Sequence, residues 1–388
     1  MPDTKRPARR DLRNHHGPAK EERGHGPHLV RNLLVGASVT VLTLGLLLKA
    51  TWAPDSWRLL TTIRLDAVGA ALGLIAVTWA IGGLRAWLMT RSLGYPIPYS
   101  AALRATLVGA MVSGLTPFTG GGGAAEALVL SQAGIPYAKA LATVNAAGVL
   151  NQSVLLVASL ALAFSPVPLP GLPVVRAILR WILVVYALGL LGVVAALLQL
   201  DWLAGPVERL LGRLERVMPA WAARLRAART RSRHFLLSTA DAFRTVVAGR
   251  PAVMAVVGAG FLVYYLLIFL VAPILANNLG GRIHAGVLVA AQFPLFLVGG
   301  VLPTPGASGG IEAGMAAIAA PYLPRAAVGI FVSVWRLLTF YPSLMAGAVA
   351  AAVSVHRSAV AAVPEAVSSE EPPGGPARTG ASSLREPV

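Results

Sequence analysis

Long apolar runs separated by short polar stretches dominate the chain. A helix needs about 20 apolar residues to cross the ~30 Å hydrocarbon core of a bilayer. Six runs meet this length, and they cover residues 29–50, 66–90, 138–164, 174–199, 252–276 and 326–355. Two further apolar stretches, 101–134 and 284–320, are interrupted midway by proline and glycine. The pattern predicts an all-α polytopic membrane protein with about six full spans and two shorter paired elements.

The two interrupted stretches carry similar motifs of proline, glycine and a following glutamate. In the first these are Pro117, Gly120, Gly121, Gly122, Gly123 and Glu126, and in the second Pro303, Pro305, Gly306, Ser308, Gly309, Gly310 and Glu312. An offset of 186 residues aligns Pro303 with Pro117 and Glu312 with Glu126. Because proline and glycine both disfavour a continuous helix, each stretch is predicted to be a re-entrant hairpin. Non-helical backbone at membrane depth must be surrounded by protein or water.

Positive charge indicates the orientation of the chain. The sequence has 33 Lys and Arg against 16 Asp and Glu, and the basic residues cluster between apolar runs. This distribution is typical of cytoplasmic loops of membrane proteins rather than of nucleic-acid binding, so both termini are expected inside, at the cytoplasmic membrane. Residues 101–134 must then return to the side from which they start, whereas 284–320 enter from the opposite side. Similar motifs in opposite orientation predict an inverted-topology repeat, as in alternating-access carriers.

The stretch 201–250 differs from the rest because it combines ten arginines with four acidic residues. Apolar residues recur every three or four positions from Leu203 to Leu225, which predicts a basic amphipathic helix on an anionic cytoplasmic surface. Binding to nucleic acid or to a partner groove is the alternative. The polar segments 1–28 and 357–388 are expected to be disordered cytoplasmic tails, leaving 29–356 as the transmembrane domain.

The two motifs suggest how an anionic group is held. A glycine turn that leads into a helix exposes backbone N–H groups, which attract phosphate. Glu126 and Glu312 lie at depth, where a charge costs roughly 2.5–3.5 kcal/mol, so each must pair, cap a helix, face water or be protonated. Arg336, deep in the last span, is the candidate counter-charge for Glu312 or for a phosphate. A helix cap for the glutamates and a purely structural ion pair for Arg336 are the alternatives.

Other polar residues are weaker candidates. Arg104 and Lys139 are nearer a membrane face and are predicted to steer phosphate. Asn151, together with Asn145 and Gln152, either lines a polar path or makes hydrogen bonds between helices.

Two classes of catalytic site are excluded. The chain has no cysteine, which rules out thiolate nucleophiles and cysteine metal sites. The segment Gly306–Gly310 fits the nucleophile pattern G-x-S-x-G, but no strand precedes it and no aspartate follows Asp241. We therefore predict no enzymatic activity, no cofactor and no metal.

With both motifs in view, the chain resembles the lysylphosphatidylglycerol synthase transmembrane-region family, also called flippase-like integral membrane proteins. The residues that carry the resemblance are Leu115–Gly123, Glu126, Gly134–Pro136, Pro303–Gly306, Gly309–Glu312, Trp335–Phe340 and Pro342. The first motif departs from the family, since four glycines stand where relatives often carry a polar or basic residue. The resemblance implies a multi-spanning protein that moves lipids or lipid-linked headgroups between leaflets, here without the aminoacyl-transferase domain.

The expected function is therefore translocation of an anionic lipid or a polyprenyl-phosphate-linked substrate, with its headgroup between the hairpin turns. One alternative is a secondary transporter of a small anion, which a polar pocket closed to lipid would favour. The other is a non-transporting membrane partner of a lipid or cell-envelope biosynthetic enzyme.

Overall fold

The computed structural model describes residues 56–165, 173–218, 221–281 and 284–368, together with positions 42, 45, 46, 48 and 49. All regular secondary structure in these residues is helical. Among them, five helical segments are long and apolar enough to cross a membrane: Leu65–Ser92, Tyr137–Phe164, Leu179–Leu198, Pro251–Asn278 and Arg325–His356. The protein is thus an all-α polytopic membrane protein, as predicted. The predicted first span, 29–50, lies outside the described residues except for the isolated positions.

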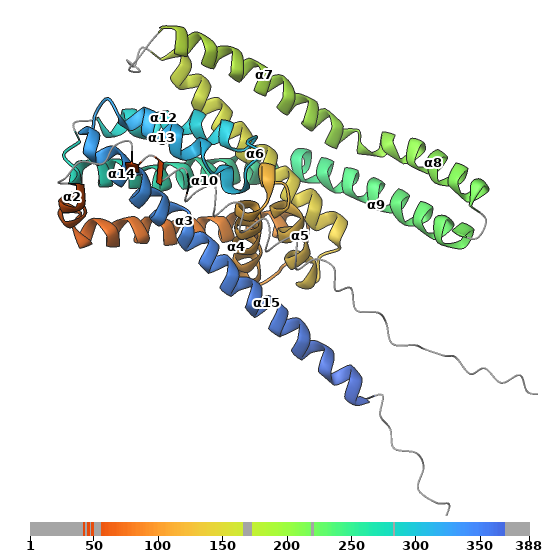
Figure 1. The fold of residues 1–388 in the computed structure, drawn as a ribbon. Helices are drawn as coiled ribbons and strands as arrows, with labels where there is room; N and C mark the ends of the chain where they lie inside the picture. The colour runs from red at the N-terminus through yellow and green to blue at the C-terminus, as the bar shows by residue number, and fades with distance from the viewer. Residues whose placement is uncertain are drawn as a thin grey trace, which may run out of the picture.

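Figure 1 shows how the helices are arranged, and they follow one another along the chain in this order. The first half contains α2 (Ser56–Thr62), α3 (Leu65–Ser92), α4 (Tyr99–Leu115), η1 (Pro117–Thr119), α5 (Gly122–Gln132), α6 (Tyr137–Phe164) and α7 (Pro173–Leu198). Then come η2 (Leu200–Leu203), α8 (Ala204–Val217), α9 (Ala222–Gly249), α10 (Pro251–Phe269), α11 (Val271–Asn278), α12 (Ala285–Gly299), η4 (Pro305–Ala307), α13 (Gly310–Ala319), α14 (Arg325–Thr339) and α15 (Tyr341–Ser368).

Both interrupted stretches fold as helical hairpins. In the first, α4 packs against α5 and η1 forms the turn; in the second, α12 packs against α13 around η4. The helix before each turn stops because the chain becomes extended at a threonine that precedes proline, at Thr116 (φ −112°, ψ 141°) and at Thr304 (φ −92°, ψ 142°). Proline disfavours the helical conformation of the residue before it, which explains where each break falls.

The two halves repeat with an offset of 188 residues. The elements that begin 188 residues apart are η1 and η4 at Pro117 and Pro305, α5 and α13 at Gly122 and Gly310, and α6 and α14 at Tyr137 and Arg325. The offset of 186 predicted from the sequence is therefore wrong. It matched Pro117 with Pro303, whereas the backbone matches Pro117 with Pro305. As a consequence, Glu126 and Glu312 do not occupy equivalent positions in their hairpins.

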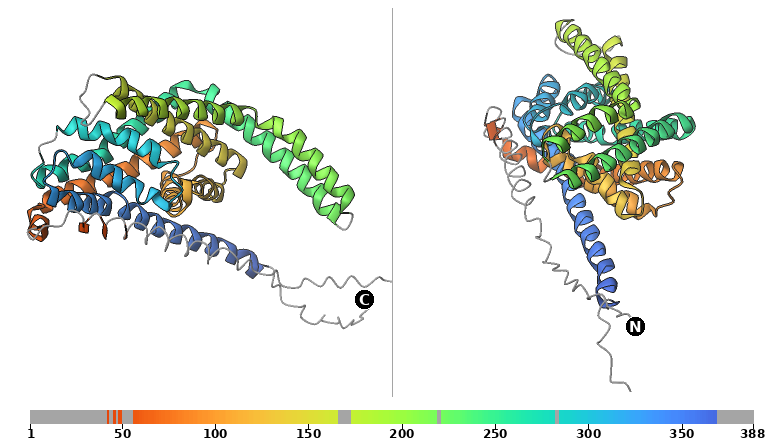
Figure 2. Two further views of the ribbon diagram at one scale, coloured as in Figure 1. Left: turned by 45° about the horizontal axis from the view of Figure 1, so that its top comes forward. Right: turned by 90° about the vertical axis from the view of Figure 1, so that its right-hand side faces the viewer.

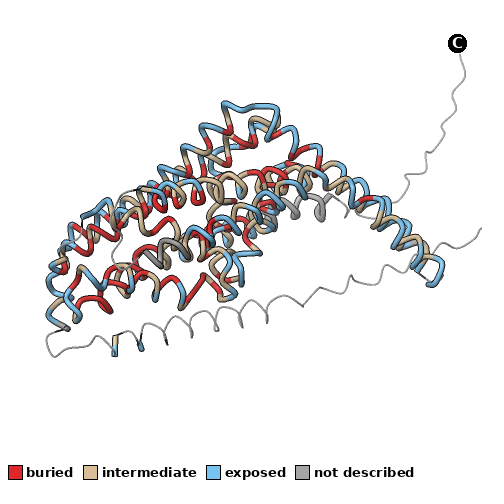
Figure 3. The backbone as a smooth tube through the Cα atoms, turned by 90° about the horizontal axis from the view of Figure 1, so that it is seen from above, coloured by how far each residue is buried: buried red, intermediate tan, exposed pale blue. Residues whose placement is uncertain are grey.

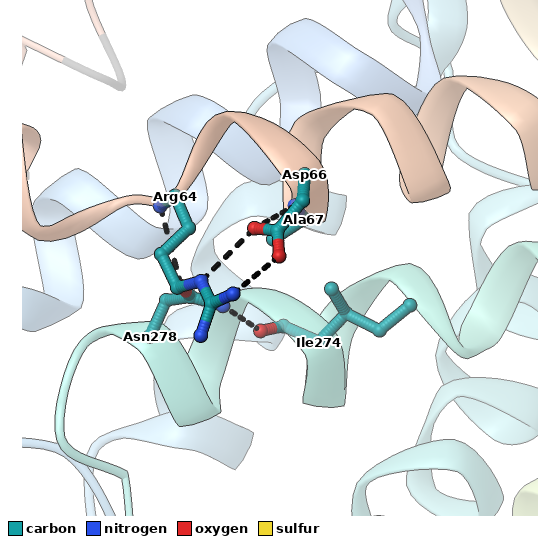
Figure 4. Close-up of polar contacts among 5 residues, drawn as sticks. All are labelled: Arg64, Asp66, Ala67, Ile274 and Asn278. Atoms are coloured by element: carbon teal, nitrogen blue, oxygen red, sulfur yellow. Dashed lines mark hydrogen bonds and ion pairs between the residues drawn. The ribbon is translucent and has the colours of Figure 1, made fainter.

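The two hairpins open at opposite ends of the bundle. The N-terminal end of α3 meets the C-terminal end of α11, where the Arg64 backbone N–H donates to Asn278 Oδ1 at 3.3 Å (Figure 4). The second hairpin starts just beyond this contact, while the first starts after the far end of α3. At that far end, Lys139 Nζ donates to Tyr95 Oη at 3.0 Å and joins the two ends of the first hairpin. This arrangement is the one expected of an inverted repeat.

Two predicted spans are kinked rather than continuous. Between α10 and α11 the break falls at Leu270, because Pro273 has no N–H to donate to the carbonyl of Phe269. The buried Gln292 side chain donates to that carbonyl instead, at 3.0 Å. Between α14 and α15 the break falls at Phe340, shortly before Pro342.

The C-terminal helix is also longer than predicted. α15 runs to Ser368, into the segment 357–388 that was expected to be a disordered tail. Residues 359–366 include four alanines, and alanine has the highest intrinsic helix preference.

The basic segment is a hairpin of two helices instead of one amphipathic helix. α8 ends because Met218 precedes proline and leaves the helical conformation (φ −122°, ψ 70°). The pairs Arg226–Glu215 and Arg233–Glu208, each at 3.1 Å, join α9 to α8. The hairpin extends beyond the rest of the bundle (Figure 2), and most of it is exposed, whereas buried residues gather in the bundle (Figure 3).

Candidate functional site

The turns of the two hairpins meet inside the bundle. The Phe118 backbone N–H in η1 donates to the Leu302 carbonyl before η4, at 3.2 Å. On the other side of the contact, a Cβ on Gly306 would lie 3.1 Å from the carbonyl oxygen of Gly114. Two segments that open at opposite ends of the bundle therefore touch through their non-helical backbone.

Both turns contain consecutive residues in the left-handed conformation. These are Phe118 (φ 56°) and Thr119 (φ 53°) in η1, and Gly306 (φ 61°) and Ala307 (φ 54°) in η4. Left-handed backbone at a residue other than glycine is uncommon and costs about 1–3 kcal/mol, and it is concentrated at functional sites. Gly306 is also sterically required, since a Cβ there would come within 2.6 Å of the Phe340 ring. The strain marks this contact as a candidate functional site.

The turns differ in exposure. Pro117, Phe118, Thr119 and Gly120 are all exposed, and Phe118 exposes 58% of its surface. In the second turn Pro305, Ala307 and Ser308 are buried. The first turn thus lies at the lateral surface of the bundle and the second in its interior.

Glu312 and Arg336 form a closed pair beneath the second turn. Glu312 Oε1 lies 2.8 Å from Arg336 Nε, and the Glu312 and Arg336 side chains expose 0% and 6% of their surfaces. Glu312 Oε2 accepts a hydrogen bond of 2.7 Å from the Gly309 N–H, which caps α13. Arg336 Nη2 donates to the Gly306 carbonyl at 2.6 Å, and its guanidinium stacks over Phe340. The structure brings these predicted residues together, with their charges engaged by the hairpin itself.

Glu126 lies elsewhere and faces Arg85 of α3. The two side chains interact electrostatically but form no ion pair within 4.0 Å. The Arg85 guanidinium stacks over Phe261, 3.5 Å from the ring centroid, and lies 5.2 Å from that of Tyr264. Arg85 Nε and Nη1 are buried and have no hydrogen-bond partner among the described residues.

Arg85 is the site residue that sequence reasoning missed. It lies inside a predicted span, near the end, where a basic residue is easily taken for one that reaches the membrane surface. The signal that marks it is the pair Gly82 and Gly83 just before it. A Cβ on Gly83 would lie 3.0 Å from Leu103 Cα, so these glycines let α4 approach α3 closely. That approach encloses the arginine instead of leaving it to reach water.

Asn151 belongs to a polar network that links three helices. Tyr265 Oη of α10 donates to Asn151 Oδ1 at 2.8 Å, and Asn151 Nδ2 donates to Gln152 Oε1 at 3.0 Å. Gln152 in turn contacts the hydroxyl of Tyr186 in α7. Two of the three predicted amides, Asn151 and Gln152, therefore make hydrogen bonds between helices. The network adjoins Arg85, because Tyr265 interacts with that guanidinium.

The predicted glycines serve close packing and internal capping. A Cβ on Gly122 would lie 1.8 Å from Ser113 Oγ, and one on Gly310 would lie 2.3 Å from Leu302 Cδ1. The Gly121 N–H at the start of α5 donates to Thr116 Oγ1 at 3.1 Å. The N–H groups before α5 and α13 that were expected to attract phosphate thus include two that the protein caps itself.

The predicted steering residues lie away from the turns. Arg104 is near the start of α4, about three helical turns before η1. Lys139 is at the open end of the first hairpin, bonded to Tyr95. The structure therefore separates both from the meeting point of the turns.

Residues 33–347 match the family described as the lysylphosphatidylglycerol synthase TM region. A UPF0104 membrane protein of Archaeoglobus fulgidus is 23% identical over 332 residues, which cover 84% of this chain and 98% of that protein. The matched range contains both hairpins, the Glu312–Arg336 pair and the facing Arg85 and Glu126. This chain belongs to the lysylphosphatidylglycerol synthase TM region family.

Proposed function

We propose that this protein moves an anionic lipid, or a lipid-linked anionic headgroup, between the two leaflets of the cytoplasmic membrane. The observation that carries the proposal is the contact between Phe118 and Leu302, which joins the turns of two hairpins that open at opposite ends of the bundle. Both termini and the α8–α9 hairpin then lie on the cytoplasmic side, because basic segments favour that side.

An inverted pair of hairpins suits the passage of a headgroup. A headgroup that enters from either leaflet reaches the same pair of turns, and small movements of one hairpin against the other would change which side has access. The turns expose backbone without helical hydrogen bonds at that depth, which the protein tolerates only where a polar path or protein surrounds it.

Lateral exposure favours a lipid over a small soluble anion. The first turn lies at the surface of the bundle, and its most exposed large side chain is the apolar Phe118. A headgroup can therefore reach the turns while its acyl chains stay in the bilayer. A carrier of a soluble anion would instead enclose its substrate on all sides.

A second candidate function is that of a non-transporting membrane partner of a biosynthetic enzyme. The observation in its favour is the projecting α8–α9 hairpin, which exposes Trp202, Leu210 and Val217 next to its arginines. Exposed apolar residues of this kind are typical of contact surfaces.

The proposal is tested by leaflet exchange in proteoliposomes with labelled polyprenyl-phosphate and anionic phospholipid probes. The natural chain has no cysteine, so the double variant Phe118→Cys/Leu302→Cys allows a bifunctional thiol reagent to join the turns. We expect exchange faster than in empty vesicles, lost on cross-linking and restored by a cleavable linker. The control is Glu215→Cys/Arg226→Cys, which joins α8 to α9 outside the spans and should leave exchange unchanged.

Two results would contradict lipid translocation. One is the absence of exchange with every probe by folded wild-type protein. The other is exchange that continues at full rate when the turns are cross-linked. Uptake of inorganic phosphate without lipid exchange would identify a small-anion transporter instead.

A further inference from the structure

We propose that Arg85 and Glu126 form a proton-linked anion site, in which a phosphate group binds Arg85 while Glu126 takes up a proton. The inference deepens the proposed function by naming the chemistry of its ligand, and it concerns binding rather than transport. It rests on the geometry of two charged side chains that the closed Glu312–Arg336 pair does not involve.

The backbone makes room for both side chains. A Cβ on Gly260 of α10 would lie 3.1 Å from Arg85 Cγ, and a Cβ on Gly109 of α4 would lie 2.9 Å from Glu126 Cβ. Alanine at either glycine would push against the charged side chain. Two charges set among four helices against missing Cβ atoms are thus a built feature of the bundle.

The arginine has hydrogen-bonding capacity that the described protein does not use. Its Nε and Nη1 atoms are buried and lack a hydrogen-bond partner among the described residues, in contrast to the Arg336 guanidinium, which contacts Glu312 and the Gly306 carbonyl. A buried charged donor without a partner is costly. A guanidinium presents a planar fork that matches two oxygens of a phosphate, so a phosphate group is the ligand that this geometry fits.

Aromatic side chains hold the guanidinium in place. Phe261 stacks on it, and Tyr264 lies on the same helix one turn further on. The Tyr265 hydroxyl is engaged by Asn151. Cation–π contacts orient the plane of an arginine without consuming its N–H groups, which leaves the fork available for an anion.

Counting charges links the proton to the anion. Arg85 is the charged side chain that faces Glu126 from α3, and Tyr264 and Tyr265 face Arg85 from α10. The other charged side chains on the helices packed against α5 are Arg104 of α4, Lys139 of α6, which is bonded to Tyr95, and Asp66 and Arg91 of α3.

With one nearby cation, Arg85 balances either Glu126 or a phosphate, but not both. In a low-dielectric interior an unbalanced charge is strongly unfavourable. Protonation of Glu126 when the phosphate binds keeps the net charge of the site at zero in both states. One proton therefore enters with each singly charged anion.

The test is calorimetric titration of the purified protein with dioctanoyl phosphatidylglycerol at one pH in two buffers of different ionisation enthalpy. The difference in apparent heat gives the number of protons taken up. We expect wild type to take up close to one proton for each lipid bound. Glu126→Gln should bind without proton uptake, and Arg85→Gln should weaken binding about tenfold or more, as for loss of a charged hydrogen bond.

Controls separate the site from general effects. Arg91→Gln removes an exposed arginine that stacks over Trp87 on the same helix, and it should retain both binding and proton uptake. Arg85→Lys keeps the charge and guards against a loss of folding, which thermal unfolding measures for every variant. A parallel titration with inorganic phosphate distinguishes a lipid headgroup from free phosphate, since tighter binding of phosphate would identify the soluble anion.

Several results would overturn the proposal: no binding of either probe by wild type, unchanged affinity in Arg85→Gln, binding by wild type without proton uptake, or uptake that persists in Glu126→Gln. These outcomes are separable from those for transport. Binding with proton uptake but no leaflet exchange would overturn only the translocase proposal, and leaflet exchange without proton uptake would overturn only this one.

Discussion

Four charged side chains inside the bundle perform two kinds of work. Glu312 and Arg336 contact each other directly and hold the second turn through Gly309 and Gly306. Glu126 and Arg85 face each other across a gap, and part of the guanidinium is unused. The difference arises from position within the hairpin. Glu312 is the third residue of α13 and can reach back to its cap, whereas Glu126 is the fifth residue of α5 and points to another helix.

The closed pair is expected to stabilise the fold. Glu312→Gln or Arg336→Gln alone leaves the opposite charge buried and unpaired, which costs about 3–5 kcal/mol. We expect a clear fall in the thermal unfolding temperature of each variant, measured by intrinsic fluorescence in detergent.

The double variant Glu312→Gln/Arg336→Gln separates the pair from other effects. Because residues in contact are not additive, it should lose less stability than the two single losses together. Single variants as stable as wild type would show that the pair does not hold the turn.

At the scale of elements, glycines set how closely helices pack. α4 is covered on one side by α15, where a Cβ on Gly347 would lie 2.4 Å from Met111 Cβ and 2.5 Å from the Leu107 carbonyl oxygen. Contacts through small residues are the usual way in which membrane helices approach each other. This packing fixes α4, and with it the first turn.

Gly347→Ala should therefore destabilise the protein, because the added methyl group meets backbone that cannot move aside. Gly258→Ala is the matched control, since Gly258 also lies within a helix and has nothing within 4 Å of a Cβ. There alanine should be neutral or stabilising by up to about 1 kcal/mol. Thermal unfolding of both variants checks the contrast, and equal effects would show that α4 and α15 do not pack this tightly.

Proline and glycine made the element boundaries predictable from sequence. Both hairpins and both of their turns were found, because the residues that break a helix act locally. The register of the repeat was not, since several prolines and glycines lie close together and two alignments fit almost equally well. The kinks at Leu270 and Phe340 were also missed, because an apolar run looks the same whether or not a side chain such as Gln292 replaces a lost hydrogen bond.

At the scale of the whole molecule, the inverted arrangement is the main result. The start of α3 lies with the end of α11, and the end of α3 lies with α9 and the start of α10, where Met89, Phe243 and Met254 pack together. The α8–α9 hairpin belongs to the same end as the opening of the first hairpin, since Phe235 stacks on Tyr137.

Single cysteines at the open ends test this arrangement. Gln132 and Ala320 are exposed, end the two hairpins and are 188 residues apart. We expect Gln132→Cys and His234→Cys to react with an impermeant thiol reagent from one side of the membrane, and Ala320→Cys from the other. The cysteine-free wild type is the blank. Labelling of Gln132→Cys and Ala320→Cys from the same side would contradict the inverted repeat.

The sequence by itself determined that the chain is an all-α membrane protein, where its hairpins turn and which family it resembles, because hydrophobic length and helix-breaking residues are local properties. Only the tertiary structure decided which charges meet. Arg85 and Glu126 are separated by 40 positions and interact because α3 and α5 both pack on α4. Likewise, a contact between the turns at Phe118 and Leu302 depends on how two hairpins from opposite ends of the bundle pack, which no local pattern encodes.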